Sequence, residues 1–323
     1  MTIIEQAALR LKQLERAGVT IPADAPRTPA RPEVTTTRAE TERMPTVATL
    51  SQQEPAALAG PAIDRLPQVV LRGEAQARRC SCHPPIALDL ERLRADGHLV
   101  PDGVRSEMAE QFRHLKRPLL KTARTQNAST GQRGGLIMVT SALPGEGKTF
   151  CSINLAMSMA MEVDSSVILI DADVVRPSIA ARLGITAKLR GLLDHLIDDR
   201  IDLADLIIET NVPKLRLMAA GERNDRSTEL LASAAMERLL TQLSEEYADH
   251  VVIFDAPPLL LTTESVVLAS KVGQVLVVVE SGKTSISAVR QAFAALKGCP
   301  NVVSVLNKCD QGSDGRRYDY YYG

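Results

Sequence analysis

The stretch that decides the fold reads Leu136-Ile137-Met138-Val139-Thr140-Ser141-Ala142-Leu143-Pro144-Gly145-Glu146-Gly147-Lys148-Thr149. An apolar run typical of a buried strand leads into a loop of small residues, and the loop opens a helix. The loop has the phosphate-loop pattern, with Ala142 in place of the first glycine. Small residues let successive backbone N–H groups turn inward around phosphate oxygens at the positive end of a helix. A glycine-rich turn without a ligand is the weaker alternative.

The loop predicts ATP as the ligand. We expect the Lys148 ammonium to reach the β- and γ-phosphates and the Thr149 hydroxyl to ligate Mg²⁺. Asn307 follows the last predicted strand, where purine-reading side chains often lie in P-loop folds, and a simple strand-ending turn is nearly as good an interpretation. The predicted ATP-binding residues are Ala142, Pro144, Gly145, Glu146, Gly147, Lys148, Thr149, Phe150 and Asn307.

Acidic residues end two other apolar runs. Asp171-Ala172-Asp173 follows Val167–Ile170, and Asp255-Ala256-Pro257-Pro258 follows Val251–Phe254. A carboxylate at the end of a buried strand is costly unless it meets a cation or hydrogen-bond donors. Beside a phosphate loop the natural cation is Mg²⁺, so we predict Asp171, Asp255 and Thr149 as metal ligands. The alternative is that the acids cap following helices or turns, and it weighs most for Asp173.

Strand-like runs alternate with helical patterns from Ile86 onward. The predicted strands are Leu136–Thr140, Val167–Ile170, Leu215–Met218, Val251–Phe254, Val275–Val279 and Val302–Leu306. The helix candidates between them are Lys148–Met161, Thr228–Tyr247 and Ser285–Leu296. This alternation predicts an α/β fold, a P-loop NTPase-like, mainly parallel sheet with helices on both faces. Ligands of such sheets bind at the carboxyl ends of the strands.

Composition and charge exclude several classes of protein. The 323 residues allow one α/β core plus extra segments, and the net charge of −1 gives no basic field for nucleic acid. No apolar run approaches the roughly 20 residues of a membrane-spanning helix, and the N-terminus lacks a signal-peptide pattern. We therefore expect a cytoplasmic protein that reaches a membrane only through a partner. The five scattered cysteines do not predict a disulfide framework.

Two segments precede the predicted core, which spans residues 86–310. Residues 1–18 carry apolar side chains at helical spacing and predict an amphipathic helix, which either docks a partner or packs on the protein's own core. Residues 19–85 hold more than half of the 18 prolines and few bulky apolar residues, which predicts a flexible linker. Cys80, Cys82 and His83 faintly resemble metal ligands, but no second ligand pair follows at a zinc-like spacing.

The C-terminal segment, residues 311–323, concentrates tyrosine. Four of the five tyrosines lie there, behind a polar stretch that contains glycine: Tyr318, Tyr320, Tyr321 and Tyr322. A tyrosine cluster behind a mobile tether is suited to accept phosphate, and each phosphate adds roughly −1.5 to −2 charge. Packing on the core or on a neighbouring subunit is the alternative. We predict these four tyrosines as phosphorylation sites.

Taken together, these features resemble the bacterial tyrosine kinases, the P-loop autokinases of polysaccharide export systems. The resemblance covers residues 86–323. It rests on the 142–149 loop, the Asp171-Ala172-Asp173 and Asp255-Ala256-Pro257-Pro258 motifs, the segment Ser227-Thr228-Glu229-Leu230-Leu231 and the tyrosine tail.

The family assigns roles to these residues. It implies that Lys148 and Thr149 hold ATP·Mg²⁺, that Asp255 supports the metal, and that Asp171 or Asp173 helps to deprotonate the tyrosine. Lys148 and the three aspartates are the predicted catalytic residues. The expected activity is ATP-dependent autophosphorylation of the tail, in trans within an oligomer, which regulates exopolysaccharide polymerisation or export.

The resemblance also implies partners. The expected activator is a separate transmembrane chain-length-determinant protein, which would hold the chain at the inner face of the membrane. A cognate tyrosine phosphatase is a further candidate partner. The N-terminal helix and long linker are similar to those of kinases found beside exosortase-type exopolysaccharide gene sets.

One motif of the family concerns oligomerisation. Glu110-Gln111-Phe112-Arg113-His114-Leu115-Lys116 is similar to the family's Glu-x-x-Arg-x-x-Arg ring motif, which predicts that Glu110, Arg113 and Lys116 lie at an oligomer interface. Lys116 replaces the last arginine and cannot form the same bidentate pair. A solvated charged helix is the alternative. A second departure is Val175, where the family often has arginine, although Arg176 follows at once.

Two rival functions share the same ATP site. A partitioning or cell-division-positioning ATPase has the P-loop, the sheet and the acidic motifs, but it usually carries an extra lysine where this chain has Leu143, and it lacks a tyrosine tail. A non-catalytic regulator, in which ATP occupancy switches the assembly of an export complex, is the other rival.

Overall fold

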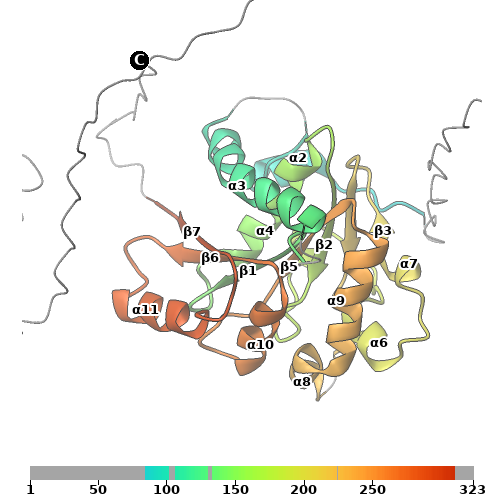
Figure 1. Ribbon diagram of the computed structural model, residues 1–323. Coiled ribbons are helices and arrows are strands. Elements are labelled where there is room, and N and C mark those ends of the chain that lie inside the picture. The colour runs from blue at the N-terminus through green and yellow to red at the C-terminus, as the bar shows by residue number, and fades with distance from the viewer. Residues whose placement is uncertain (1–83, 102–105, 130–132, 224, 310–323) are drawn as a thin grey trace, which may run out of the picture. The chain divides into compact units, whose positions relative to one another are not determined.

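The computed structural model describes residues 84–101, 106–129, 133–223 and 225–309 (Figure 1). All of them belong to one compact unit, Leu71–Gly323. The predicted N-terminal helix, nearly all of the predicted linker with Cys80, Cys82 and His83, and the tail tyrosines lie outside the described residues. None of the helices in the described ranges is long and apolar enough to span a lipid bilayer.

A seven-stranded sheet forms the core, with the strand order β3-β4-β2-β5-β1-β6-β7. The strands are β1 (Leu136–Ser141), β2 (Ser166–Asp171), β3 (Ile208–Glu209), β4 (Leu215–Met218), β5 (His250–Asp255), β6 (Gln274–Glu280) and β7 (Val302–Asn307). Every pair of neighbours is parallel except β3 with β4. All the predicted strands are confirmed, with ends that differ by at most one residue. The edge strand β3 was not predicted, because two residues are too short to show an apolar pattern.

Helices cover both faces of the sheet, which confirms the predicted fold class (Figure 1). The helices α2, α3 and α4 lie on one face, and α6, α8, α9, α10 and α11 lie on the other. The helices are α2 (Leu90–Ala95), α3 (Glu107–Ser129), α4 (Lys148–Ala160), α5 (Ile179–Arg182), α6 (Leu192–Ile197), α7 (Leu203–Leu206), α8 (Ser227–Ala232), α9 (Ala234–Glu246), α10 (Thr263–Lys271) and α11 (Ile286–Ala295).

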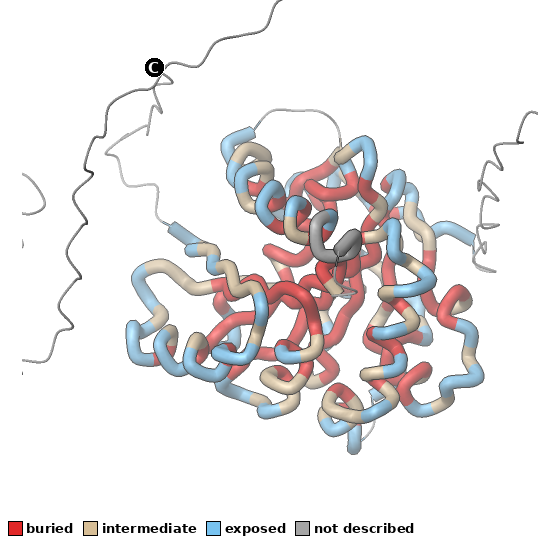
Figure 2. Tube along the Cα trace, viewed as in Figure 1, coloured by how far each residue is buried: buried red, intermediate tan, exposed pale blue. Residues whose placement is uncertain are grey.

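The central strands β1, β2, β5 and β6 are mostly apolar, as expected for strands that are buried on both faces. In β1, Ile137 and Val139 join the core under α2, α3 and α4, whereas Leu136 and Met138 join the core under the opposite helices. This alternation follows from the two-residue period of a strand. Figure 2 shows the result, a buried central sheet surrounded by helices whose outer surfaces are exposed.

The predicted single helix Thr228–Tyr247 is wrong, because the segment forms two helices, α8 and α9. Ser233 lies between them in an extended conformation, with φ −73° and ψ 167°. Its hydroxyl accepts a hydrogen bond from the Met236 backbone N–H at 3.2 Å. Serine is a strong N-cap residue, so it ends one helix and begins the next without interrupting the apolar pattern from which the single helix was predicted.

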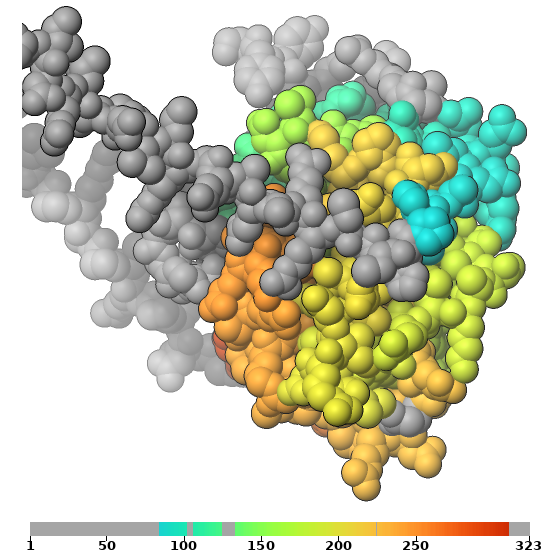
Figure 3. Space-filling view, turned by 90° about the vertical axis from the view of Figure 1, so that its right-hand side faces the viewer, coloured from blue at the N-terminus to red at the C-terminus, as the bar shows by residue number. Residues whose placement is uncertain are grey.

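The first described residues join the sheet at its β3 edge. The Ile86 N–H donates to the Glu209 carbonyl at 2.8 Å. The Asn211 side chain accepts from the Leu88 N–H at 2.9 Å and donates to the Leu88 carbonyl at 3.0 Å. In the space-filling view of Figure 3 the cyan start of the described chain accordingly lies against the yellow surface around residue 210.

Candidate nucleotide and acceptor site

The phosphate loop connects β1 to α4 through two glycines in the left-handed region. Gly145 has φ 87° and Gly147 has φ 98°, which are backbone conformations that residues other than glycine rarely adopt. A Cβ atom on Gly147 would lie 2.1 Å from the Asn307 Nδ2 atom, so the loop also needs glycine for space. Gly147 is the N-cap of α4, and the helix therefore begins at Lys148 with its N–H groups directed at the loop.

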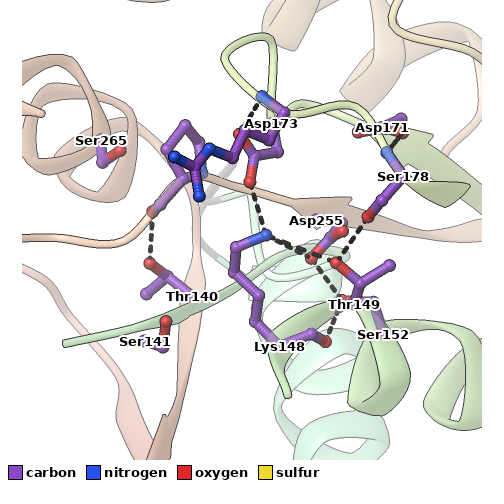
Figure 4. Close-up of polar contacts among 12 residues, drawn as sticks. Thr140, Ser141, Lys148, Thr149, Ser152, Asp171, Asp173, Ser178, Asp255 and Ser265 are labelled. Carbon is purple, nitrogen blue, oxygen red and sulfur yellow. Dashed lines mark hydrogen bonds and ion pairs between the residues drawn. The ribbon is translucent and has the colours of Figure 1, made fainter. Parts of the chain in front are cut away.

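The Lys148 ammonium meets aspartates from two neighbouring strands (Figure 4). Its Nζ lies 2.6 Å from Asp173 Oδ2 and 3.9 Å from Asp255 Oδ1. It also lies 3.4 Å from the Thr149 hydroxyl. Because β2 and β5 are parallel neighbours and β5 pairs with β1, the acids at their carboxyl ends meet the lysine that follows β1. The sheet thus brings the two acidic motifs to the phosphate loop.

Asp171 and Asp255 are deeply buried carboxyls. Burial, followed by the charge of Asp255, raises the pKa of Asp171 to about 7, although the Ile179 and Ser178 N–H groups oppose the shift. Burial also raises the pKa of Asp255, against the opposing charge of Lys148. Asp171 Oδ1 and Asp255 Oδ2 are buried acceptors without a hydrogen-bond partner in the described part of the chain. A cation is a suitable partner for two such oxygens.

The residues present fit Mg²⁺. Magnesium in nucleotide sites is bound by one or two protein oxygens, and substrate phosphates and waters complete its shell. The Thr149 hydroxyl contacts Asp255 and accepts a hydrogen bond from the Ser178 hydroxyl at 3.1 Å. Within the described ranges no group of three or more His, Cys, Asp or Glu residues could hold a metal by itself. The site thus offers Thr149, Asp171 and Asp255 but needs the nucleotide to complete the ligand set.

A cavity of about 500 Å³ opens beside these groups. Its lining comes from the phosphate loop, the segment after β2, the segment after β5 and the end of β7. The lining residues are Pro144, Gly145, Gly147, Lys148, Thr149, Phe150, Asp173, Val175, Arg176, Ser178, Arg182, Pro258, Leu261, Asn307 and Lys308. Most of the predicted ATP-binding residues are among them, and Asp171 and Asp255 lie buried next to this lining.

Two predicted ATP-binding residues do not line the cavity. Ala142 is fully buried in the core. The Glu146 side chain is buried and turned toward the segment after β6. Its carboxylate accepts from the Leu143 N–H at 2.6 Å, from the Glu280 N–H at 3.4 Å and from the Thr284 hydroxyl. Glu146 therefore stabilises the loop through hydrogen bonds outside the cavity. Only its backbone belongs to the groups predicted to surround the phosphates.

Sequence reasoning missed several residues of the site. The Ser152 hydroxyl donates to Asp255 Oδ1 at 3.1 Å and contacts the Lys148 carbonyl at 2.9 Å. The sequence could have identified Ser152, because it lies four residues after Lys148 and therefore on the same face of the helix. Lys308 donates to the Gly145 carbonyl at 2.7 Å, beside the predicted Asn307, which donates to the Glu146 carbonyl at 2.9 Å. Nothing local in the sequence pointed to the Ser178 hydroxyl.

The predicted oligomerisation residues divide into a surface pair and a buried lysine. Arg113 forms an ion pair with Glu110, one turn earlier on α3, and both side chains are partly exposed. Lys116 instead points inward, where its Nζ donates to the Ser158 carbonyl at 2.5 Å and pairs with Glu162 at 2.8 Å. Here Lys116 joins α3 to the end of α4. Its predicted interface role remains a prediction.

The chain matches a known domain and known kinases. The AAA domain model matches residues 135–304, more than half of the chain. Tyrosine-protein kinase CpsD of Streptococcus agalactiae is 28% identical over 190 residues, which cover 58% of this chain and 81% of CpsD. Tyrosine-protein kinase YwqD of Bacillus subtilis is 28% identical over 214 residues, which cover 66% of this chain and 86% of YwqD.

The fold has a counterpart among solved structures. The kinase domain of Escherichia coli tyrosine kinase ETK superposes with a TM-score of 0.51 at 24% identity, over 72% of this chain and 98% of that domain. At this identity the superposition supports the fold alone. Together with the named relatives, it confirms the predicted resemblance to the bacterial tyrosine kinases.

Proposed function

Because the chain belongs to the AAA domain family, we propose that it binds ATP·Mg²⁺ and acts as a protein-tyrosine kinase. The observation that carries the proposal is the convergence of Lys148, Asp171, Asp173 and Asp255 beside a cavity of about 500 Å³. The similarity to CpsD and YwqD, which are named tyrosine-protein kinases, favours phosphoryl transfer to tyrosine over the other reactions of P-loop proteins.

ATP would lie across the carboxyl edge of the sheet. The N–H groups at the start of α4 and the Lys148 ammonium bind the β- and γ-phosphates. Lys148 must then leave Asp173, which holds it at 2.6 Å. Asn307, which lines the β7 end of the cavity, is the residue proposed to contact the purine. Thr149, Asp171 and Asp255 hold Mg²⁺, which supplies positive charge to the phosphates when it is bound.

The transfer step follows from these positions. The tyrosine oxygen attacks the γ-phosphorus, the bond from that phosphorus to the β,γ-bridging oxygen breaks, and ADP leaves. The phenolic proton passes to an aspartate. Asp173 is the best candidate because it loses its ion pair when Lys148 turns to the phosphates, whereas Asp171 and Asp255 would hold the metal.

We further propose that the acceptors are Tyr318, Tyr320, Tyr321 and Tyr322, which are modified in trans within an oligomer. In this proposal the protein lies at the inner face of the membrane through a transmembrane activator, and it regulates exopolysaccharide polymerisation or export. The support is the tyrosine cluster and the family resemblance. Several phosphates within six residues would repel one another and change what the tail can bind.

The test is a phosphorylation assay on the full chain. Purified protein is incubated with its membrane activator, ATP and Mg²⁺, and phosphate is mapped by mass spectrometry. We expect phosphotyrosine in residues 318–322 of the wild type and none in Lys148→Ala or in a chain with all four tail tyrosines changed to phenylalanine. ATP binding should survive in the tyrosine variant and be lost in Lys148→Ala.

Each outcome separates the proposal from its rivals. ATP hydrolysis without phosphotyrosine in the wild type would point to an ATPase of the partitioning type. ATP binding without hydrolysis or transfer would point to an ATP-switched regulator. Phosphotyrosine that persists in Lys148→Ala would contradict the assignment of the site.

A further inference from the structure

Two successive carbonyl groups of the phosphate loop are held by side chains that follow β7. The Gly145 carbonyl accepts a hydrogen bond from Lys308 Nζ at 2.7 Å, and the Glu146 carbonyl accepts one from Asn307 Nδ2 at 2.9 Å. The donors lie 163 and 161 residues further along the chain. The end of β7 therefore fixes the orientation of two peptide groups in the loop.

The orientation of these peptide groups decides what the loop can bind. In a trans peptide the carbonyl oxygen and the N–H group of the next residue point in opposite directions. Because the Gly145 carbonyl is directed at Lys308, the Glu146 N–H is turned away from that lysine. Asn307 orients the Gly147 N–H in the same way. Backbone N–H groups turned to one side are what a phosphate loop offers to phosphate oxygens.

Lys308 has an unusual backbone conformation, with φ 55°. Among the non-glycine residues of the described ranges, only Lys214 shares a positive φ. Pairing with β6 enforces this geometry, since the Asn307 carbonyl accepts from the Ser281 N–H at 2.8 Å. Conformations of this kind concentrate at functional sites. Glycine would adopt the same φ without steric strain, so the presence of lysine indicates a use for its side chain.

The ion pair of Lys308 does not explain that use. Lys308 Nζ lies 3.3 Å from Glu280 Oε1, but the lysine side chain is 47% exposed, and exposed ion pairs contribute little to stability. Lys283 Nζ lies 3.4 Å from the same oxygen. Lys308 lines the nucleotide cavity, whereas Lys283 is not part of its lining. The contact that distinguishes the two lysines is the hydrogen bond to Gly145.

We propose that Lys308 is a positioning residue for the phosphate loop. Its ammonium holds the Gly145 carbonyl, so that the loop presents its N–H groups to the phosphates before the nucleotide arrives. A loop that is already ordered loses less conformational entropy on binding, and the affinity rises accordingly. This inference rests on the proposed function, because it requires the phosphates of ATP to occupy the loop.

A direct contact with the purine is the competing role. Lys308 lines the cavity next to Asn307, the residue proposed to contact the base. The two roles differ in the part of the nucleotide that they affect. A purine contact stabilises only ligands that carry a base, whereas an ordered loop stabilises every ligand that carries the phosphates.

The test compares ATP with inorganic tripolyphosphate, which carries three phosphates and no base. Each ligand is titrated with Mg²⁺ against a fluorescent ATP analogue bound to the full chain. Lys308→Met should weaken both ligands about tenfold, the size expected for the loss of a hydrogen bond from a charged group. Lys308→Arg, which keeps a charged donor, should recover part of the loss. Lys283→Met is the matched control for the pair with Glu280 and should change neither affinity.

A second readout separates positioning from a merely structural role. Lys308→Gly removes the ammonium and also relieves the positive φ. It should bind tripolyphosphate about tenfold more weakly than the wild type, as Lys308→Met does, while its urea midpoint does not fall. A lower urea midpoint in Lys308→Gly would attribute the loss of binding to the fold and overturn the inference.

The remaining outcomes are equally distinct. If Lys308→Met weakens ATP but leaves tripolyphosphate unchanged, Lys308 contacts the purine and the positioning role is overturned. An equal loss in Lys283→Met would overturn it as well, because the shared partner Glu280 would then be responsible. A wild type that binds ATP but not tripolyphosphate has no ordered phosphate site, which also contradicts the inference. A wild type that binds neither ligand contradicts the proposed function itself.

Discussion

At the scale of single residues, the phosphate loop depends on the close approach of Gly147 to Asn307. The Asn307 amide donates to the Glu146 carbonyl at 2.9 Å and occupies the space where a Cβ on residue 147 would lie. One glycine therefore serves two needs, a left-handed backbone and room for a side chain that arrives from β7.

We predict that Gly147→Ala weakens ATP binding by about tenfold or more, which corresponds to about 1.4 kcal/mol. The new methyl group displaces Asn307 and breaks its bond to the loop, in addition to the strain of a positive φ. Gly145→Ala is the matched control, because it has the strain but no neighbour within 4 Å. ATP titration should show the larger loss for Gly147→Ala. In a double-mutant cycle, Asn307→Ala should weaken ATP binding only slightly once Gly147 is alanine. Full additivity of the two losses in ATP binding would contradict this account.

A second residue, His98, is buried without a partner for its Nδ1 atom among the described residues. It packs on Phe150, which follows the phosphate loop, with 5.0 Å between the ring centroids. Burial and the charge of Arg182 lower the pKa of His98, and they outweigh the opposing effects of Asn154 and Asp96. The neutral ring is therefore the form that suits the fold.

We predict a loss of stability as pH falls below the ordinary histidine pKa of 6.5. Below pH 6.5 the unfolded chain binds a proton on this histidine, whereas the folded chain binds it only at lower pH. Protonation therefore stabilises the unfolded state relative to the folded state. The stabilisation is present above pH 6.5 and is lost as pH falls toward the lowered folded pKa. Urea unfolding at pH 7.5 and pH 5.5 measures the change in the free energy of unfolding. His98→Phe should remove the part of this change that comes from His98. An identical pH dependence in the variant would contradict the role of His98.

At the scale of elements, α3 is attached to α4 by a buried lysine. Lys116 bonds to the Ser158 carbonyl at 2.5 Å and to Glu162 at 2.8 Å, and its side chain is 6% exposed. The hydrogen bond from Lys116 lowers the pKa of Glu162, although burial opposes the shift. Because α4 begins at the phosphate loop, this contact also supports the helix that carries Lys148 and Thr149.

We predict that Lys116→Met lowers the free energy of unfolding by about 1.5–3 kcal/mol, the range of hydrogen bonds to charged groups. The cost stays below that of breaking a fully buried pair because Glu162 remains partly hydrated. Arg113→Met, which removes a half-exposed pair with Glu110, is the control and should cost less than about 1 kcal/mol. Urea denaturation measures both variants. If Lys116→Met weakens self-association and leaves stability unchanged, the predicted interface role is favoured instead.

At the scale of the whole molecule, the parallel sheet assembles the site. The ends of β1, β2 and β5 bring together a lysine and three aspartates from distant parts of the sequence, and β7 closes the other end of the cavity. The last described residues follow β7 beside this cavity, which Lys308 lines. Whether a tail meets its own site or that of a neighbour is a property of the assembly.

We predict transfer in trans. Lys148→Ala keeps the tyrosines but lacks the lysine, whereas the chain with four tail phenylalanines keeps the lysine but lacks the acceptors. Neither should be labelled alone. A mixture should place phosphotyrosine on the Lys148→Ala chain, as detected by mass spectrometry with chains of different tag length. A mixture without label, under conditions that label the wild type, would instead favour transfer within one chain.

The sequence by itself determined the strands, the phosphate loop and the acids that end β2 and β5. These features are local: a strand shows its apolar run, and the loop shows its small residues within a few positions. The same locality explains the error at Ser233, where a cap lies inside an apolar pattern that continues through it, and the omission of β3, which is only two residues long.

Only the tertiary structure decided which side chains meet. Glu146 bonds to Thr284, 138 residues away, so it supports the loop from behind and does not line the cavity. Lys116 bonds to Ser158, 42 residues away, and turns inward, although the sequence suggested a surface motif. The physical reason is the same in both cases: a side chain's partner depends on which strands and helices pack together, and that information is not contained in its neighbours along the chain.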